Sequence, residues 1–216
     1  MMIDEPTYSR YFESLVHGDR LTCLEIAAGL VESGTPYHVL YTHLFQRSLY
    51  AIGALWEANR ISVAVEHLAT AVTESVMASL YPRLLAIQNP KGKRAVISCT
   101  VNEYHQIGAR MAADMLESCG WDAWFLGANT PKQDLLSLLQ EKQPDLLGLS
   151  VSLSDNMPKL LELMECVRSD FPRMDLLVGG QAFRWVGADA AQSVSGATYI
   201  PSLEELIQSV CPGGSE

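Results

Sequence analysis

The hydrophobic pattern of the chain changes its period at residues 89–93, and this change limits the fold more than any other feature. Before these residues, apolar side chains recur at helical spacing; after them, short β-branched runs alternate with helical segments. The segment itself reads Asn89-Pro90-Lys91-Gly92-Lys93, with two helix breakers and two charges, which is typical of a linker. We therefore predict two domains, over residues 1–89 and 90–216.

The first domain is predicted to be an antiparallel four-helix bundle, because its helical segments are joined by short connections. Asp19 is the expected N-cap of the second helix and Thr35 that of the third, with Pro36 as the first residue of the third helix. Pro82 lies near the end of the fourth helix, where it is expected to allow a kink. The four predicted segments are Tyr8 to Val16, Asp19 to Ser33, Thr35 to about Asn59, and a segment through His67, Val72, Val76 and Leu80.

The second domain is predicted to be a Rossmann-like (flavodoxin-like) α/β domain with a parallel five-stranded sheet. Strands and helices alternate about five times, and the strands are apolar throughout, as buried parallel strands are. The predicted strands are Arg94–Thr100, Asp122–Leu126, Leu146–Ser150, Leu176–Val178 and Thr198–Ile200. The predicted helices are Gly108–Cys119, Lys132–Gln140, Pro158–Arg168, Phe183–Ser193 and Leu203–Val210.

Composition excludes several classes of function. The formal net charge is −10 and the basic residues are scattered, which argues against a nucleic-acid partner. No apolar run reaches the roughly 18 residues of a membrane span, and the acidic, polar start does not resemble a signal peptide, so we expect a cytoplasmic protein. The five cysteines form no C-x-x-C pair, so we expect reduced thiols and no zinc site.

The loop after the first predicted strand contains the residues with the clearest chemistry. It reads Glu103-x-His105-x-x-Gly108 and contains neither a dinucleotide-binding nor a phosphate-binding glycine motif. A carboxylate two residues before a histidine can bond one ring nitrogen and direct the other toward a metal. One histidine and one carboxylate are too few to hold a bare ion, so the pattern suits a corrin-bound cobalt or a haem iron. A loop histidine in a capping network is the alternative.

Small residues follow two other predicted strands, at the edge where ligands of open α/β sheets bind. Ser150, Ser152 and Ser154 lie at the end of one strand, and Gly179-Gly180 lies at the end of the next. We expect them to line a deep slot between strand ends. Tight strand-to-helix turns, which also use glycine and serine, are the alternative.

In the helical half, Trp56-Glu57 ends the third predicted helix and Glu66-His67 lies on the fourth. Adjacent residues on a helix point about 100° apart, so Glu66 and His67 cannot both face the core. This pair predicts either a polar surface that faces a cavity or a boundary pair with no ligand.

Taken together, these motifs resemble the cobalamin-binding module, and in particular the CarH-type light-sensing repressors. The module's D-x-H-x-x-G motif corresponds to Glu103–Gly108, with Glu in place of Asp as in the photoreceptor subgroup. Its S-x-L motif corresponds to Ser150–Ser152, with Ser in place of Leu, and its G-G motif to Gly179–Gln181. The subgroup's W-x9-E-H pattern matches Trp56–His67. The resemblance covers residues 8–210.

The resemblance implies that cobalamin binds in a cleft between the two domains. His105 would be the lower axial ligand of cobalt, and Glu103 would orient it. The nucleotide tail would enter a slot bordered by Gly108, Ser150, Ser152, Gly179 and Gly180. Trp56 would cap the upper face, beside Glu66 and His67. The expected cofactor-binding residues are Trp56, Glu66, His67, Asn102, Glu103, Tyr104, His105, Gln106, Ile107, Gly108, Ser150, Val151, Ser152, Gly179, Gly180 and Gln181, with His105 as the metal ligand.

Two departures from the subgroup affect the expected function. Glu57 stands where the repressors have a second cobalt-ligating histidine, which puts such a photoproduct in doubt; His38 and His43 are the other bundle histidines. The repressors also have an N-terminal DNA-binding domain, and this chain begins at the bundle. We expect a non-enzymatic, adenosylcobalamin-dependent light sensor that acts through a regulatory protein partner or a homo-oligomer. Methylcobalamin or hydroxocobalamin as the bound form, a corrinoid methyl carrier and a haem-binding variant are the alternatives.

Overall fold

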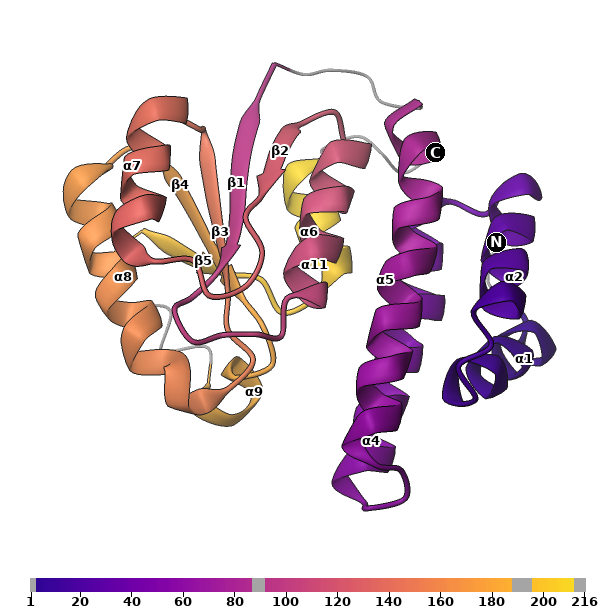
Figure 1. Cartoon of the computed structure of the whole chain (residues 1–216). Coiled ribbons are helices and arrows are strands. Elements are labelled where there is room, and N and C mark those ends of the chain that lie inside the picture. Colours follow the sequence, from indigo (N-terminus) through magenta and orange to yellow (C-terminus); the bar gives the residue numbers. More distant parts are fainter. Residues whose placement is uncertain (1–2, 87–91, 188–195, 212–216) are drawn as a thin grey trace. The chain divides into compact units, whose positions relative to one another are not determined.

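The structure of the protein is a computed structural model that describes residues 3–86, 92–187 and 196–211 (Figure 1). The chain forms two compact units, residues 1–87 (unit 1) and residues 88–216 (unit 2), which are described separately below.

Unit 1 is helical, as predicted. Its elements are α1 (Glu5–Val16), α2 (Arg20–Glu32), α3 (Tyr37–Leu40), the π-helix η1 (Tyr41–Gln46), α4 (Arg47–Glu57) and α5 (Val63–Ala86). The segments α3, η1 and α4 follow one another without a break, where a single regular helix was expected. Buried aromatic rings pack along this segment, with the Tyr41 and Phe45 ring centroids 5.4 Å apart.

Of two helix caps predicted in unit 1, one is confirmed and the other is wrong. The Asp19 side chain accepts a hydrogen bond from the Thr22 backbone N–H at 3.2 Å, so Asp19 caps α2 as predicted. The prediction for the third helix is wrong by one residue. Pro36 is the N-cap, because its ψ of 143° is extended and not helical, and no side chain caps this helix. α5 continues past Pro82 to Ala86.

Unit 2 contains the predicted five-stranded sheet, and every strand pair is parallel. The strands are β1 (Arg94–Cys99), β2 (Asp122–Phe125), β3 (Leu146–Ser150), β4 (Asp175–Gly179) and β5 (Ala197–Tyr199). Their order is β2-β1-β3-β4-β5, so β1 lies between β2 and β3. The chain direction across the sheet reverses at β1, and ligands of such folds bind beyond the carboxyl ends of the strands at this point.

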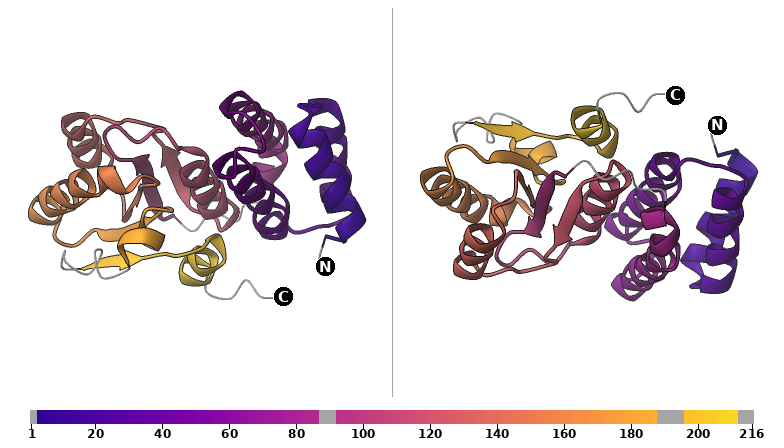
Figure 2. Two further views of the ribbon diagram at one scale, coloured as in Figure 1. Left: turned by 90° about the horizontal axis from the view of Figure 1, so that it is seen from below. Right: turned by 90° about the horizontal axis from the view of Figure 1, so that it is seen from above.

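Helices cover both faces of this sheet. They are α6 (Ile107–Ser118), α7 (Lys132–Lys142), the 3-10 turn η2 (Ser154–Asn156), α8 (Met157–Asp170), α9 (Phe183–Val186) and α11 (Leu203–Val210). α6 and α11 lie on one face, and α7 and α8 lie on the other (Figures 1 and 2). α7 and α8 bury leucine, methionine and valine side chains against the strands, and this packing forms the core on their face of the sheet.

Two predicted segments reach beyond the described residues. The helix expected over Phe183–Ser193 is helical to Val186 and ends at Gly187, whose φ of 89° is left-handed; residues 188–193 lie outside the described part. Residues 89–91 of the predicted linker also lie outside it.

The expectation that all five cysteines are reduced is wrong for one pair. Cys119 and Cys211 form a disulfide, with their Cα atoms 5.6 Å apart. These residues follow α6 and α11, and the packing of those two helices brings together cysteines that are 92 residues apart in the sequence. Cys23, Cys99 and Cys166 are free thiols.

None of the described helices is both long enough and apolar enough to cross a membrane.

Candidate functional site

The loop between β1 and α6 carries the Glu103–His105 motif and is held in a defined conformation by its own backbone and by the loop after β2. Asn102 adopts a left-handed φ of 65°, which asparagine tolerates better than most residues. Its N–H donates to the Asn129 side-chain oxygen at 2.8 Å, and the Glu103 N–H donates to the Thr100 carbonyl at 3.0 Å. The loop after β2 therefore supports the loop after β1, and the Glu103 side chain is completely buried.

The carboxylate of Glu103 binds His105 in the manner expected from their spacing. Glu103 Oε1 lies 2.6 Å from His105 Nδ1 and accepts the His105 backbone N–H at 2.9 Å. An ionised carboxylate can only accept, so Nδ1 carries the proton of the neutral ring. A metal bound by His105 would therefore be bound through Nε2, and the side chain is 57% exposed.

The second oxygen of Glu103 is held by the loop after β3. Glu103 Oε2 accepts hydrogen bonds from the Ser152 N–H at 2.8 Å, the Leu153 N–H at 3.1 Å and the Asn156 side-chain amide at 3.3 Å. Burial by itself raises the pKa of the Glu103 carboxyl. The hydrogen bonds from His105, Leu153 and Ser152 outweigh burial and lower this pKa to about 2, so Glu103 is an anion at neutral pH.

This arrangement makes His105 a suitable ligand for a metal that already has other ligands. A carboxylate that accepts from one imidazole nitrogen fixes the tautomer and raises the basicity of the other nitrogen. Within residues 3–86, 92–187 and 196–211, no three histidine, cysteine or acidic side chains are grouped closely enough to hold a bare metal ion.

The glycines predicted to border a slot divide into two kinds. A Cβ atom at Gly180 would lie 2.1 Å from the Val151 carbonyl oxygen, and the φ of Gly180 is 110°. A Cβ at Gly179 would lie 3.0 Å from a backbone oxygen. The Gly180 contact reflects the close approach of the segments that follow β3 and β4, and the Gly179 contact is with Ile200, which follows β5. A Cβ at Gly108 meets open space.

One buried polar atom near these strand ends is unsatisfied. Thr100 follows β1 and is fully buried, and its hydroxyl oxygen has no hydrogen-bond partner among the described residues. Its backbone N–H donates to the Ser150 carbonyl at 3.3 Å, so Thr100 and Ser150 lie side by side at the carboxyl ends of β1 and β3. A buried hydroxyl without a partner is unfavourable, and a bound polar group that reached it would remove that cost.

The remaining predicted residues of unit 2 have separate positions. The Gln106 side-chain oxygen accepts from the Ala128 N–H at 3.1 Å and so links the loops after β1 and β2. Ile107 begins α6 and is half-buried. Gln181 is exposed, and its carbonyl accepts from the Arg184 N–H at 2.9 Å.

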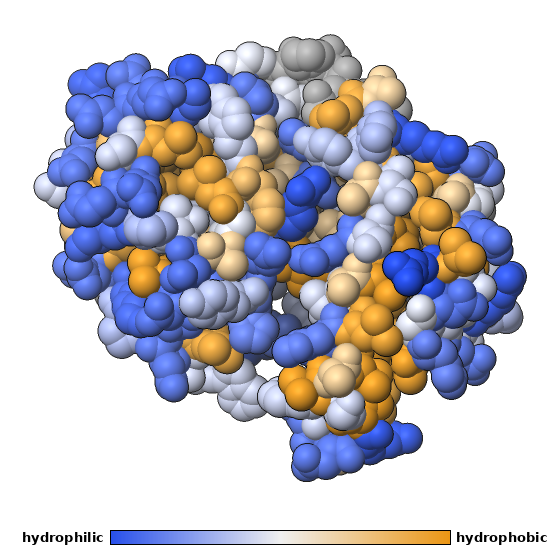
Figure 3. All heavy atoms as spheres, viewed as in Figure 1, coloured by the Kyte–Doolittle hydropathy of each residue, from blue (hydrophilic) through white to orange (hydrophobic). Residues whose placement is uncertain are grey.

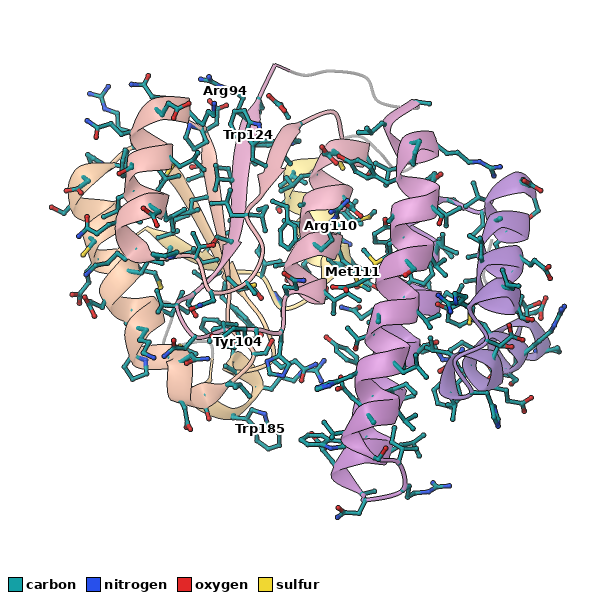
Figure 4. All side chains as sticks on the ribbon, viewed as in Figure 1. Arg94, Tyr104, Arg110, Met111, Trp124 and Trp185 are labelled. Atoms are coloured by element: carbon teal, nitrogen blue, oxygen red, sulfur yellow. A yellow bond between two sulfur atoms is a disulfide. The ribbon has the colours of Figure 1, made fainter. Side chains whose placement is uncertain are left out.

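Large apolar side chains are exposed after three neighbouring strands. Tyr104 after β1 is 66% exposed, Leu153 after β3 is 47% exposed and Trp185 after β4 is 79% exposed. Figure 4 shows Tyr104 and Trp185 at the carboxyl end of the sheet, which is the lower end of unit 2 in this view. Of these three residues, only Tyr104 was predicted from the sequence to bind the cofactor.

The predicted residues of unit 1 lie near the ends of two helices. Trp56, in the last turn of α4, is 47% exposed. Glu66 and His67 are in α5, with His67 Nε2 at 3.5 Å from Glu66 Oε2, and neither residue is buried. Figure 3 shows hydrophobic surface over α4 and α5, the elements that carry Trp56 and the exposed Val63 and Leu68.

Asn129, Leu153 and Asn156 were not selected from the sequence, although all three follow predicted strands. Trp185 was not selected either and lies in the predicted helix Phe183–Ser193. Their spacing forms no motif, and Asn156 is 53 residues from Glu103. The only available signal was the rule that ligands meet the carboxyl ends of parallel strands, and this rule selects loops and not residues.

Comparison with protein families finds two matches. Residues 93–201 match a model described as the B12 binding domain, and residues 7–81 match a second model with the same description.

Curated relatives include a repressor and corrinoid proteins. The chain is 31% identical to the HTH-type transcriptional repressor CarH of Myxococcus xanthus over 62% of this chain and 44% of that protein. It is 24% identical to dimethylamine corrinoid protein 3 of Methanosarcina acetivorans over 64% of this chain and 66% of that protein. The chain therefore spans less than half the length of CarH.

Among solved structures, the monomethylamine corrinoid protein of Methanosarcina barkeri superposes with a TM-score of 0.84 at 16% identity. The superposition covers 97% of this chain and 99% of that one. At this identity the likeness establishes a shared fold.

Proposed function

The chain belongs to the family of B12-binding domains, and from this premise we propose that it binds cobalamin with His105 as the lower axial ligand of the cobalt. The observation that carries this proposal is the buried Glu103 carboxylate at 2.6 Å from His105 Nδ1. The proposed metal ligand is Nε2 of a half-exposed ring that follows β1, at the edge of the sheet where ligands of this fold bind.

The residues around His105 fit the proposed cofactor. The open space at Gly108 leaves room for a chain-like group such as the nucleotide tail, and the buried Thr100 hydroxyl would give it a polar partner. The exposed Tyr104, Leu153 and Trp185 side chains would provide apolar contact for a broad macrocycle.

We propose further that the bound form is adenosylcobalamin and that the protein is a light-responsive, non-catalytic switch. Its support is the W-x9-E-H pattern of Trp56–His67 together with the CarH relative. When bound, adenosylcobalamin supplies a photolabile cobalt–carbon bond. In this proposal Trp56 covers the upper ligand, with Glu66 and His67 beside it. Loss of that ligand would release Trp56 and change how the protein assembles with itself or with a protein partner.

An absorption experiment tests both parts of the proposal. Apo-protein is mixed with adenosylcobalamin in the dark, and spectra and elution volume are recorded before and after green light, for the wild type and for His105→Ala. We expect a bound spectrum that changes on illumination, a change in elution volume or partner binding, and altered binding in the variant. Absence of binding would contradict the cofactor assignment, whereas binding without any light-dependent change would contradict the switch.

A corrinoid methyl carrier is the second candidate, favoured by the corrinoid-protein relative. The substitution Trp56→Ala separates the two functions. A sensor should lose its preference for adenosylcobalamin over methylcobalamin in this variant. In a carrier the wild type should show no such preference. A haem-binding protein would instead show a haem spectrum when purified from cells supplied with both cofactors.

A further inference from the structure

The last two described elements of unit 2, β5 and α11, form a short arm over residues 197–211. β5 is a three-residue strand at the edge of the described sheet, where it pairs with β4. α11 packs beside α6 and buries Leu203, Leu206 and Val210 (Figures 1 and 2). A helix of eight residues is not stable by itself, so the position of this β5–α11 arm depends on its tertiary contacts.

Two groups hold the end of the β5–α11 arm. The Trp121 indole N–H donates to the Val210 carbonyl at 3.4 Å, and Cys211 forms the disulfide with Cys119. Cys119 is the C-cap residue of α6 and Cys211 is that of α11, so the covalent bond joins the ends of the two helices. The hydrogen bond is long, and the disulfide is therefore the stronger of the two restraints.

The sulfur atoms of this pair belong to partly exposed residues. Neither Cys119 nor Cys211 is buried, and exposed disulfides are the labile ones that exchange with thiols in solution. Cys23 and Cys99, in contrast, are fully buried, and burial raises the pKa of their thiols to about 11 and about 12. Those two thiols stay protonated at neutral pH and do not compete for the exchange.

The β5–α11 arm also borders the ligand-binding edge of the sheet. Ile200 follows β5, and its N–H donates to the Val178 carbonyl of β4 at 2.8 Å. A Cβ atom at Gly179 would lie 3.0 Å from the Ile200 carbonyl oxygen. Gly179 ends β4, where the slot for the nucleotide tail is expected. Movement of the arm would therefore change the packing at one side of that edge.

We propose that Cys119 and Cys211 form a site of reversible thiol–disulfide exchange with a dithiol, and that their redox state controls how firmly the β5–α11 arm is held. A thiolate of the dithiol attacks one sulfur of the pair, so the S–S bond breaks and a mixed disulfide forms. The second thiol of the dithiol then releases the protein. The protein gains two electrons and two protons as two thiols, and the dithiol leaves as a disulfide.

The first experiment measures this exchange on the folded apo-protein. Dithiothreitol is added with and without urea at a concentration that does not unfold the protein, and alkylation followed by mass spectrometry quantifies the Cys119–Cys211 bond. We expect a reduction rate proportional to the dithiothreitol concentration and unaffected by the urea, with recovery of the bond on addition of glutathione disulfide. A rate that levels off with dithiothreitol, or that rises with urea, would mean that the bond opens only after unfolding and would overturn the proposal.

The second experiment measures hydrogen exchange in the oxidised and reduced apo-protein. Reduction should speed the exchange of α11 amides about 10- to 100-fold, because the detached arm is no longer cross-linked, and should leave β1 and β3 amides unchanged. Cys119→Ser should exchange like the reduced wild type in both conditions. Cys166→Ser, which removes a free thiol, should respond to reduction as the wild type does. Equal exchange of α11 amides in both redox states, or faster exchange throughout unit 2 on reduction, would overturn the control of the arm.

The third experiment measures the effect on ligand binding, and this part of the inference rests on the proposed function. Thiols react with cobalamin, so oxidised wild type is compared with the double variant Cys119→Ser/Cys211→Ser without reductant, by absorption titration with hydroxocobalamin. We expect binding about 2- to 10-fold weaker in the double variant, because the edge at Gly179 is less ordered before binding. Cys166→Ser should bind as the wild type does.

The three experiments fail in different ways. If the wild type binds no hydroxocobalamin, the proposed function is contradicted, and the exchange kinetics and hydrogen exchange still decide the redox site and its control of the arm. If the wild type and the double variant bind hydroxocobalamin equally well, the link between the β5–α11 arm and the ligand-binding edge is overturned.

Discussion

Glu103 Oε1 lies 2.6 Å from His105 Nδ1, so a fully buried carboxylate holds an imidazole ring that is half-exposed. The two oxygens of this carboxylate bind different partners. Oε1 binds the backbone and ring of His105, and Oε2 binds the loop after β3. The position of the proposed metal ligand is therefore set by residues from two different strand ends.

Replacing Glu103 by Gln should weaken cobalamin binding by about 10- to 100-fold, the range typical for loss of a group that orients a metal ligand. A neutral amide binds Nδ1–H more weakly than a carboxylate does and can also offer it a competing N–H. The dissociation constant of hydroxocobalamin, from absorption titration, measures the effect. Glu165→Gln, an exposed acidic residue of α8, is the matched control and should bind as the wild type does.

Acid should remove a stabilising contribution that Glu103 makes at neutral pH. Because the pKa of Glu103 falls from 4.5 to about 2 on folding, the unfolded chain binds a proton more readily than the folded one. The contribution is fully present above pH 4.5 and is lost as the pH falls toward 2. A shift of this size corresponds to up to about 3 kcal/mol.

Urea unfolding of apo wild type and apo Glu103→Gln between pH 7 and pH 2.5 tests this assignment. The wild type should lose more unfolding free energy than the variant between pH 5 and pH 2.5. Equal losses in the two proteins would show that other carboxylates account for the acid sensitivity.

Gly180→Ala should lower the free energy of unfolding by about 2–3 kcal/mol, because the new Cβ meets the Val151 carbonyl at 2.1 Å and the φ of 110° is strained for any other residue. Thermal or urea unfolding measures the loss. A variant as stable as the wild type would mean that β3 and β4 do not approach so closely after their ends.

Gly108→Ala, unlike Gly180→Ala, should not lower the free energy of unfolding but should affect cobalamin binding. The new methyl group meets open space in the first turn of α6, so the apo-protein should be as stable as the wild type or up to about 1 kcal/mol more stable. Cobalamin binding should nevertheless weaken if the nucleotide tail occupies that space. Gly29→Ala in α2, also beside open space, controls for the helix effect and should leave binding unchanged. Unchanged affinity in Gly108→Ala would place the tail elsewhere.

The Cys119–Cys211 disulfide should stabilise unit 2 by roughly 2–5 kcal/mol, since it closes a long loop between the ends of α6 and α11. Unfolding of the wild type with and without dithiothreitol should differ by this amount, and Cys119→Ser should be insensitive to the reductant. Cys166→Ser, which changes a free thiol, should retain the difference. A thiol titration that finds five free cysteines in the purified protein would contradict the bond.

The sequence alone was sufficient for most of the secondary structure and for the Glu103–His105 pair. The predicted strand Leu146–Ser150 and helix Leu203–Val210 coincide with β3 and α11. Burial of one or both faces of an element gives its hydrophobic residues a regular spacing that is visible within a few residues. Glu103 and His105 are two residues apart, so their contact is a local property of one loop.

Features that depend on contacts between distant residues could not be predicted in this way. Asn156 reaches Glu103 across 53 positions, and Cys119 reaches Cys211 across 92. Only the pairing of β1 with β3 places Asn156 beside Glu103, the residue that binds the proposed metal ligand. Periodicity and capping depend on residues that are close in the sequence, so the sequence shows them directly. The tertiary structure decides which loops meet, because strand order and helix packing are set by burial over the whole domain.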